Sequence, residues 1–351
     1  MQDVSFGAAI RTTNGTIALF NLESQIDGLE VQARQRSLTS RSGAELVDML
    51  TLRGHILGRI ADYERAADLA EQLAHDFSTD GLAFLARART RACLHRFEEA
   101  LTDLDVAERL GLPGAEPAAE RAAILQALGR YDEALAIHRA AADRRRSFET
   151  VGALAVFHAE RGEVAEAERL FDDSRDRFRG VSPFGLAQLD FHRAHMWLAE
   201  GDLARARDWL LAAWRRLPAY KPAEGHLAEV EAEMGESETA IARLRRLAED
   251  SDDPDYAAQL ARILDEIGRH EDAAPWRASA QLRYDELVAR HPAAFADHAA
   301  EFCLTAGGDL QRALRLARQN AEIRQTPRAH ALVTRAMAAC AADRPLDAAR
   351  A

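Results

Sequence analysis

The sequence is poor in the residues that mark several common protein classes. Its three cysteines, Cys93, Cys303 and Cys340, lie far apart without a CxxC pair, which argues against a disulfide framework or a cysteine-ligated metal and favours a reducing compartment. No apolar run approaches the roughly 18 residues that span a membrane. The first residues, MQDVSFGAAI, lack the basic start and apolar stretch of a secretory signal. We therefore expect a soluble, cytoplasmic protein.

Lysine is almost absent, since Lys221 is the single lysine among 45 basic residues, a bias that we interpret as that of a GC-rich bacterial genome. Acidic residues number 57, and the net charge is −12. Nucleic acids and anionic membranes both require a basic face on the protein that binds them. The composition therefore predicts neither nucleic acid nor membrane as a partner.

Alanine and leucine dominate a hydrophobic fraction of 48%, and both favour helix over strand. A short phrase recurs in this background, with a turn residue, a polar residue, an apolar or aromatic residue, two polar residues and then alanine. Successive copies lie 33 to 40 residues apart. They end at Ala66, Ala100, Ala134, Ala167, Ala206, Ala240, Ala273 and Ala313, with a weaker copy ending at Ala349. So regular a period predicts stacked copies of one structural unit.

Each copy is typical of a helix–turn–helix. Glycines such as Gly129 and Gly268 stand where a first helix must end, because glycine adopts the left-handed conformation of a helix C-cap. The closing alanine, and another small residue twelve positions earlier, allow the two helices of a pair to approach closely. One pair cannot bury its apolar face alone, so we expect a single continuous domain.

These features resemble the tetratricopeptide repeat (TPR) family, in which a 34-residue repeat has small residues at positions eight and twenty. Tyr63, Phe97 and Tyr131 match its aromatic position seventeen, whereas the tryptophan common at position four is missing. The resemblance implies an all-α, right-handed superhelical solenoid of about eight repeats and a partial ninth over residues 42–351. Residues 1–41 form an N-terminal segment with a capping helix at 17–37. Two long spacings predict an extended segment near residues 176–185 and a second helix about two turns longer after Trp276.

In this family the first helices line an open concave groove, which assigns groove positions here. The resulting candidate binding residues are Arg59, Arg89, Phe191, Glu233, Arg262, Asp265, Glu266, His298 and Phe302, accompanied by Glu116, Glu149, Glu160, Glu229 and Asp255. The excess of carboxylates favours a basic peptide or a cation, although they are also typical of solvated charges on an acidic protein. Phe191 and Phe302 are expected to form aromatic pockets. The residues that clamp a C-terminal carboxylate in some members are absent.

One local cluster has metal-ligand chemistry. His192 and His195 occupy the sixth and ninth positions of the fifth repeat, and His226 and Glu229 occupy the same positions of the sixth. Residues three apart share a helix face, so the four side chains could converge on Zn²⁺ or another divalent metal. The alternative is that these histidines form hydrogen bonds between helices.

Three functions follow, in order of preference. The first is a scaffold that binds a partner protein or peptide in the groove, without a cofactor. The second is a regulator that responds to a peptide or metal, and the third is a metal-dependent protein built on the His/Glu cluster. No GxSxG, Walker A, HExxH or dinucleotide-binding motif supports catalysis.

Overall fold

The computed structural model describes residues 10–35, 38–112 and 114–343. These ranges contain eighteen helices and no strand. A first helix, α1 (Gly15–Gln35), precedes eight antiparallel pairs, and α18 (Pro327–Ala342) begins a ninth. The predicted all-α solenoid is therefore confirmed, while the last copy of the phrase, ending at Ala349, lies outside the described residues. None of the described helices is long and apolar enough to cross a membrane.

The eight pairs follow the repeats of the sequence. They are α2 (Ser40–Leu57) with α3 (Ile60–Asp76), α4 (Gly81–Cys93) with α5 (Phe97–Arg109), α6 (Ala115–Leu128) with α7 (Tyr131–Arg144), α8 (Phe148–Glu160) with α9 (Val164–Arg177), α10 (Phe184–Ala199) with α11 (Leu203–Arg216), α12 (Lys221–Glu233) with α13 (Ser237–Asp250), α14 (Pro254–Glu266) with α15 (His270–Arg290), and α16 (Pro292–Leu304) with α17 (Leu310–Ile323). The predicted long helix is α15, with 21 residues compared with 14 in α13. The predicted extended segment connects α9 to α10.

Small residues sit where the two helices of a pair touch. The closing alanines of all eight full copies are completely buried, as Ala66 and Ala206 illustrate. Gly54 shows the reason most directly, because a Cβ atom there would lie 3.0 Å from the Arg59 carbonyl oxygen and 3.2 Å from Asp62 Cβ. Close packing of this kind leaves no room for a larger side chain.

Glycine ends most of the first helices, as the sequence predicts. Gly129 closes α6 with φ 85°, and Gly268 follows α14 with φ 80°, both in the left-handed region. Within the described ranges, His95 is the one residue other than glycine with a positive φ, at 55°. It follows α4, in the place that glycine takes in most other repeats.

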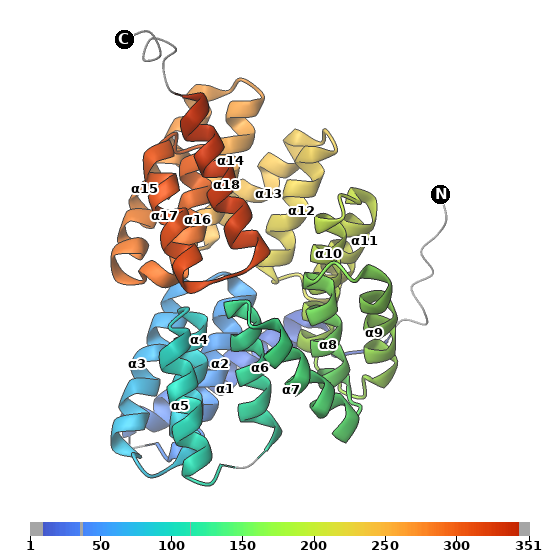
Figure 1. Ribbon diagram of the computed structural model, residues 1–351, viewed down its shortest axis with the longest axis vertical. Coiled ribbons are helices and arrows are strands. Elements are labelled where there is room, and N and C mark those ends of the chain that lie inside the picture. The colour runs from blue at the N-terminus through green and yellow to red at the C-terminus, as the bar shows by residue number, and fades with distance from the viewer. Residues whose placement is uncertain (1–9, 36–37, 113, 344–351) are drawn as a thin grey trace.

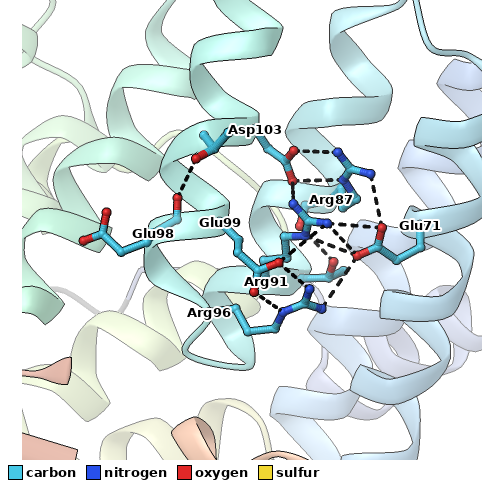
Figure 2. A network of polar contacts seen from close by, with 9 residues as sticks. Glu71, Arg87, Arg91, Arg96, Glu98, Glu99 and Asp103 are labelled. Carbon is cyan, nitrogen blue, oxygen red and sulfur yellow. Dashed lines mark hydrogen bonds and ion pairs between the residues drawn. The ribbon is translucent and has the colours of Figure 1, made fainter. Parts of the chain in front are cut away.

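Ion pairs reinforce the joints between helices, most extensively around Asp103 on α5. Figure 2 shows Arg87 and Arg91 of α4 both directed at this carboxylate, at 2.7 Å and 2.8 Å. Asp103 is 1% exposed, and the same two guanidinium groups also pair with Glu71 of α3. Buried charges require such complete pairing. Arg87 and Arg91 therefore serve the packing of α3, α4 and α5.

The first helices form an inner layer and the second helices an outer layer. Neighbouring first helices contact one another, as α2 does with α4, α8 with α10, and α16 with α18. Figure 1 shows α1–α7 (blue to green) in the lower half and α12–α18 (yellow to red) in the upper half, joined on one side by α8–α11. The chain thus turns back on itself, and α12 reaches α2.

The turn is closed by a seam between the first repeat and the loop before α14. Asp252 accepts hydrogen bonds from the backbone amides of Ile60 (2.7 Å) and Ala61 (2.9 Å), at the start of α3. Ser251 donates a hydrogen bond to the carbonyl oxygen of Gly58. A carboxylate from about 190 residues further along the chain therefore supplies the N-cap of α3.

The seam continues along both halves of the molecule. Glu64 on α3 pairs with Arg290 (2.6 Å) and with His291 (2.9 Å). His95 Nδ1 lies 3.1 Å from the Ala293 carbonyl oxygen, and the amide of Gln325 donates to the carbonyl oxygen of Leu128 at 3.1 Å. We name this set of contacts, together with those of Ser251 and Asp252, the seam. The expectation of a fully open groove is wrong on this side, because the superhelix winds until its two halves touch.

The predicted capping helix is present as α1. It packs on α2, and its first residue, Gly15, lies against the end of α11, where a Cβ atom would be 2.5 Å from the Arg216 carbonyl oxygen. The helix therefore covers the first repeat and also bridges to the fifth. Residues 36–37 of the predicted span lie outside the described ranges.

Candidate functional site

The first helices present a set of charged and titratable side chains toward the interior of the turn, and we call this set the inner surface. It comprises Asp48, His55, Arg89, Glu116, Glu120, His192, His195, His226, Glu229, Arg262, His298 and Arg328. Glu116, whose side chain is 70% exposed, and His298, at 47%, show that the surface is in contact with water.

Three carboxylates converge on one arginine at the N-terminal end of this surface. Arg89 on α4 pairs with Asp48 of α2 at 2.8 Å, with Glu116 of α6 at 3.0 Å and with Glu120 of α6 at 2.9 Å. Three consecutive repeats thus contribute to one cluster, which carries more negative than positive charge.

Burial and the neighbouring charges shift the pKa values of Asp48 and Arg89 in this cluster. Burial raises the pKa of Asp48, although Arg89 opposes the change. Burial by itself would lower the pKa of Arg89, but the carboxylates of Asp48 and Glu120 raise it above its ordinary value. An additional cation beside these carboxylates would be stabilised by the charge that Arg89 leaves uncompensated.

The predicted His/Glu cluster is assembled in part. The rings of His195 on α10 and His226 on α12 meet edge to face, with centroids 4.3 Å apart. Phe191 packs against His195 at 4.4 Å. His226 Nδ1 lies 2.6 Å from Glu229 Oε2, within one turn of α12.

The surroundings shift the pKa values of His195 and His226 in opposite directions. Burial, together with His226, lowers the pKa of His195 well below its ordinary value, and its Nε2 has no hydrogen-bond partner. Burial also disfavours charge on His226, but the Glu229 carboxylate outweighs it and raises the pKa of His226. The pair therefore combines an imidazole whose charged form is disfavoured with one whose charged form is favoured by Glu229.

This arrangement differs from a metal centre. Over residues 10–35, 38–112 and 114–343, no three His, Cys, Asp or Glu side chains are placed to hold a metal ion. His192 lies next to Phe191, at 6.0 Å between ring centroids, and does not join the contact between His195 and His226. The expected convergence of His192, His195, His226 and Glu229 is therefore not found, because His195 and His226 pack edge to face against each other and His226 pairs with Glu229. Binding of Zn²⁺ or another divalent metal by this cluster stays an untested prediction.

A further histidine joins the two halves of the inner surface. His55 Nε2 on α2 lies 2.8 Å from the hydroxyl of Tyr220, which precedes α12. Burial lowers the pKa of His55 to about 4, with His192 contributing in the same direction. The ring is therefore neutral at pH 7.

Arg328 is the unpaired cation of the inner surface. It lies in the first turn of α18, is exposed, and forms no hydrogen bond or ion pair with the described residues. Its charge acts on His195, His226 and Glu229 from across the interior. His298, in contrast, lies beside Asp297, which raises its pKa.

Several predicted groove residues have other positions. Phe302 is 2% exposed and packs on Tyr284 of α15 at 5.3 Å, so it belongs to the core. Phe191 is also buried, against His195 and Tyr220. Asp265 turns outward to His270 and Arg277 of α15, and Arg59 lies after α2, at the N-cap of α3. These predictions are wrong because a position in a repeat does not specify how each side chain turns.

Of the other predicted residues, Glu233 and Glu266 are exposed, whereas Arg262 is half-buried. Arg262 forms an ion pair with Glu266 at 2.8 Å along α14, and its charge reaches Glu229. Glu233 ends α12 and has no ion-pair partner among the described residues. They are available to solvent and are not part of the Arg89 cluster.

Four contributors to the site were missed by sequence reasoning. Asp48, His55 and Glu120 occupy the second, ninth and sixth positions of their repeats, so the repeat register was a usable signal for all three. Arg328 precedes the weakest copy of the phrase, where the register is least certain, and its role depends on the turn of the whole superhelix.

Comparisons with known proteins agree with this architecture. The structure of the human IFIT1 dimer with m7Gppp-AAAA matches with a TM-score of 0.57 and 15% sequence identity, over 92% of this chain and 77% of that chain. The structure of the human IFIT1 dimer with PPP-AAAA matches with a TM-score of 0.55 and 15% sequence identity, over 87% of this chain and 78% of that chain. The fold is that of a TPR-type solenoid. YrrB, described as a TPR protein with an unusual peptide-binding site, also matches (TM-score 0.32, 14% identity, 56% of this chain and 96% of that chain). No family model and no curated protein matches the sequence.

Proposed function

We propose that the chain is a binding scaffold whose inner surface takes a basic segment of a partner protein. The observation that carries this proposal is the convergence of Asp48, Glu116 and Glu120 on the single cation Arg89. An arginine or lysine of a partner would add the positive charge that the cluster lacks, in a partly enclosed setting where ion pairs are stronger than in free solution.

A second group of carboxylates extends the same chemistry toward the C-terminal half. Asp253 and Asp255 stand two residues apart at the start of α14, and burial and Asp255 raise the pKa of Asp253 to about 6. Neither forms an ion pair with an arginine among the described residues. A partner with basic residues at two separated positions would therefore fit better than one with a single cation.

The charge of this surface argues against RNA as the ligand. The IFIT1 structures contain a capped or 5′-triphosphate oligonucleotide. A protein that binds such ligands needs an excess of cations around the phosphates. Here the net charge is −12, and carboxylates outnumber arginine around Arg89.

Fluorescence anisotropy with labelled peptides tests the proposal. A Ser/Gly peptide carrying four arginines is expected to bind more tightly than its counterpart with four glutamates, and binding should weaken as salt rises. Glu116→Gln with Glu120→Gln should weaken it about tenfold, which corresponds to about 1.4 kcal/mol. A labelled triphosphate oligonucleotide, measured in the same assay, tests RNA as the alternative ligand.

The matched control removes the same two charges from the outer layer, as Glu98→Gln with Glu322→Gln, and should leave the affinity unchanged. Both of these glutamates are exposed on second helices. Equal affinity for the two peptides, or equal loss in both double variants, would contradict binding at the inner surface.

A further inference from the structure

An arginine-lined cavity lies outside the inner surface, between the start of α1 and the ends of α9 and α11. Its volume is about 410 Å³, which is within the range of small-molecule sites. Three arginines line it, Arg175 from α9 and Arg215 and Arg216 from the last turn of α11. The cavity is not part of the proposed function of the chain.

The arginines are only partly neutralised. Arg175 donates a hydrogen bond to Asp190, and the Nε of Arg216 lies 3.7 Å from the other oxygen of the same carboxylate. Arg215 is exposed and pairs with no acidic side chain among the described residues. Arg175 and Arg216 therefore share one carboxylate, and Arg215 has none. Nearby Arg193 does not alter this balance, because it pairs with Glu168 and Asp172.

Two buried polar atoms of this arginine–carboxylate group lack hydrogen-bond partners. The Nε of Arg216 and the Oδ2 of Asp190 are buried without a hydrogen-bond partner, since their separation exceeds hydrogen-bonding distance. Burial lowers the pKa of Arg216, and the charge of Arg175 acts in the same direction, although Asp190 opposes both. Protein groups thus leave the positive charge of this cavity incompletely compensated.

The other residues that line the cavity indicate the chemistry of the rest of the ligand. Thr12, Thr13 and Gly15 provide hydroxyl and backbone groups, whereas the Asn14 side chain is occupied in accepting from the amide of Thr16 at 2.9 Å. Ile10, Ala212 and Pro218 provide apolar surface. A bare inorganic ion would leave that apolar wall in contact with water.

We propose that this cavity binds a small organic anion whose phosphate or carboxylate head contacts Arg175, Arg215 and Arg216. Its apolar body would lie against Ile10, Ala212 and Pro218. Guanidinium groups bind both kinds of oxyanion through paired hydrogen bonds, so the head chemistry is shared between phosphate monoesters and carboxylates.

Isothermal titration calorimetry on the full chain tests the proposal with three probes of similar apolar size: phenyl phosphate, benzoate and neutral phenol. At least one of the two anions should bind with one-to-one stoichiometry and more tightly than phenol. Which anion binds better identifies the preferred head group. Absence of binding by both anions at millimolar concentration would overturn the proposal.

Arg215→Gln provides the specific variant, because Arg215 is exposed and makes no ion pair that folding needs. It should weaken anion binding about tenfold, and Arg215→Glu should weaken it further. The matched control is Arg245→Gln, an exposed arginine on α13 that does not line the cavity. Unchanged affinity in both Arg215 variants, with native helical circular dichroism, would show that the anion binds elsewhere and would overturn the assignment.

Discussion

Asp252 caps the helix that begins at Ile60, although 192 residues separate them in the chain. Both carboxylate oxygens are used, one on the amide of Ile60 and one on the amide of Ala61. This contact fixes the first repeat against the loop before α14. The inner surface therefore has one side closed by the protein itself, and access to it depends on the seam.

The first prediction concerns this cap. Asp252→Ala should lower the free energy of unfolding by about 1 kcal/mol, as expected for the loss of an N-cap, and should also expand the molecule. Urea denaturation measures the first effect and the radius of gyration from small-angle X-ray scattering the second.

Asp202→Ala is the matched control for that experiment. Asp202 caps α11 within its own repeat, by accepting from the amide of Arg205 at 3.0 Å. It should cost a similar amount of stability without changing the radius of gyration. Equal radii of gyration for wild type and Asp252→Ala would show that the cap does not hold the two halves together.

The second prediction compares two helical glycines. Gly54→Ala should destabilise the fold, because the added Cβ would lie 3.0 Å from the Arg59 carbonyl oxygen, a backbone atom that cannot easily move. Gly28→Ala on α1 meets nothing within 4 Å and should stabilise the fold by about 0.5–1 kcal/mol through helix propensity. Thermal unfolding of both variants measures whether each substitution lowers or raises the stability of the fold. Stabilisation in both would mean that the α2–α3 contact is looser than described.

The third prediction concerns the buried carboxylate of Asp103, which is shown in Figure 2. Asp103→Ala leaves Arg87 and Arg91 without their buried partner and should cost about 3 kcal/mol. Glu166→Ala removes an exposed carboxylate that pairs with Arg169 and should have little effect, because water screens such pairs. Urea denaturation of the two variants measures the difference. Similar losses would contradict a packing role for Asp103.

The fourth prediction concerns acid sensitivity. Burial lowers the pKa of His55 and of His95 to about 4, below the value near 6.5 of an unfolded chain. The unfolded state therefore binds these protons first, so stability is lost as pH falls from about 6.5 toward 4. Each histidine contributes at most about 1.4 kcal/mol per pH unit.

His55→Gln isolates one of these contributions. The slope of unfolding free energy against pH between 6.5 and 4 should be smaller in this variant than in wild type, whatever the change at pH 7. His75→Gln, an exposed histidine of α3, should keep the wild-type slope. An unchanged slope in His55→Gln would show that His55 is protonated as readily in the folded state as in the unfolded one.

The helices themselves were predictable from sequence because their causes are local. The alanines at Ala66 to Ala313, the glycines at helix ends and the longer helix after Trp276 each depend on residues within one repeat. For the same reason the capping helix was found within two residues of its actual start. Repeat register also assigned Glu116 and Glu229 to first helices, and the structure places them on α6 and α12.

The seam, the edge-to-face contact of His195 with His226 and the Asp252 cap were decided by tertiary structure. Small rotations between neighbouring repeats add up over the solenoid, and no single repeat encodes their sum. That sum brings Asp252 to Ile60, and His95 to the Ala293 carbonyl. Side-chain rotation likewise turned Phe302 into the core and Asp265 toward α15. The sequence alone determined the repeating unit and its charge, whereas the accumulated superhelical turn decided which of those charges meet.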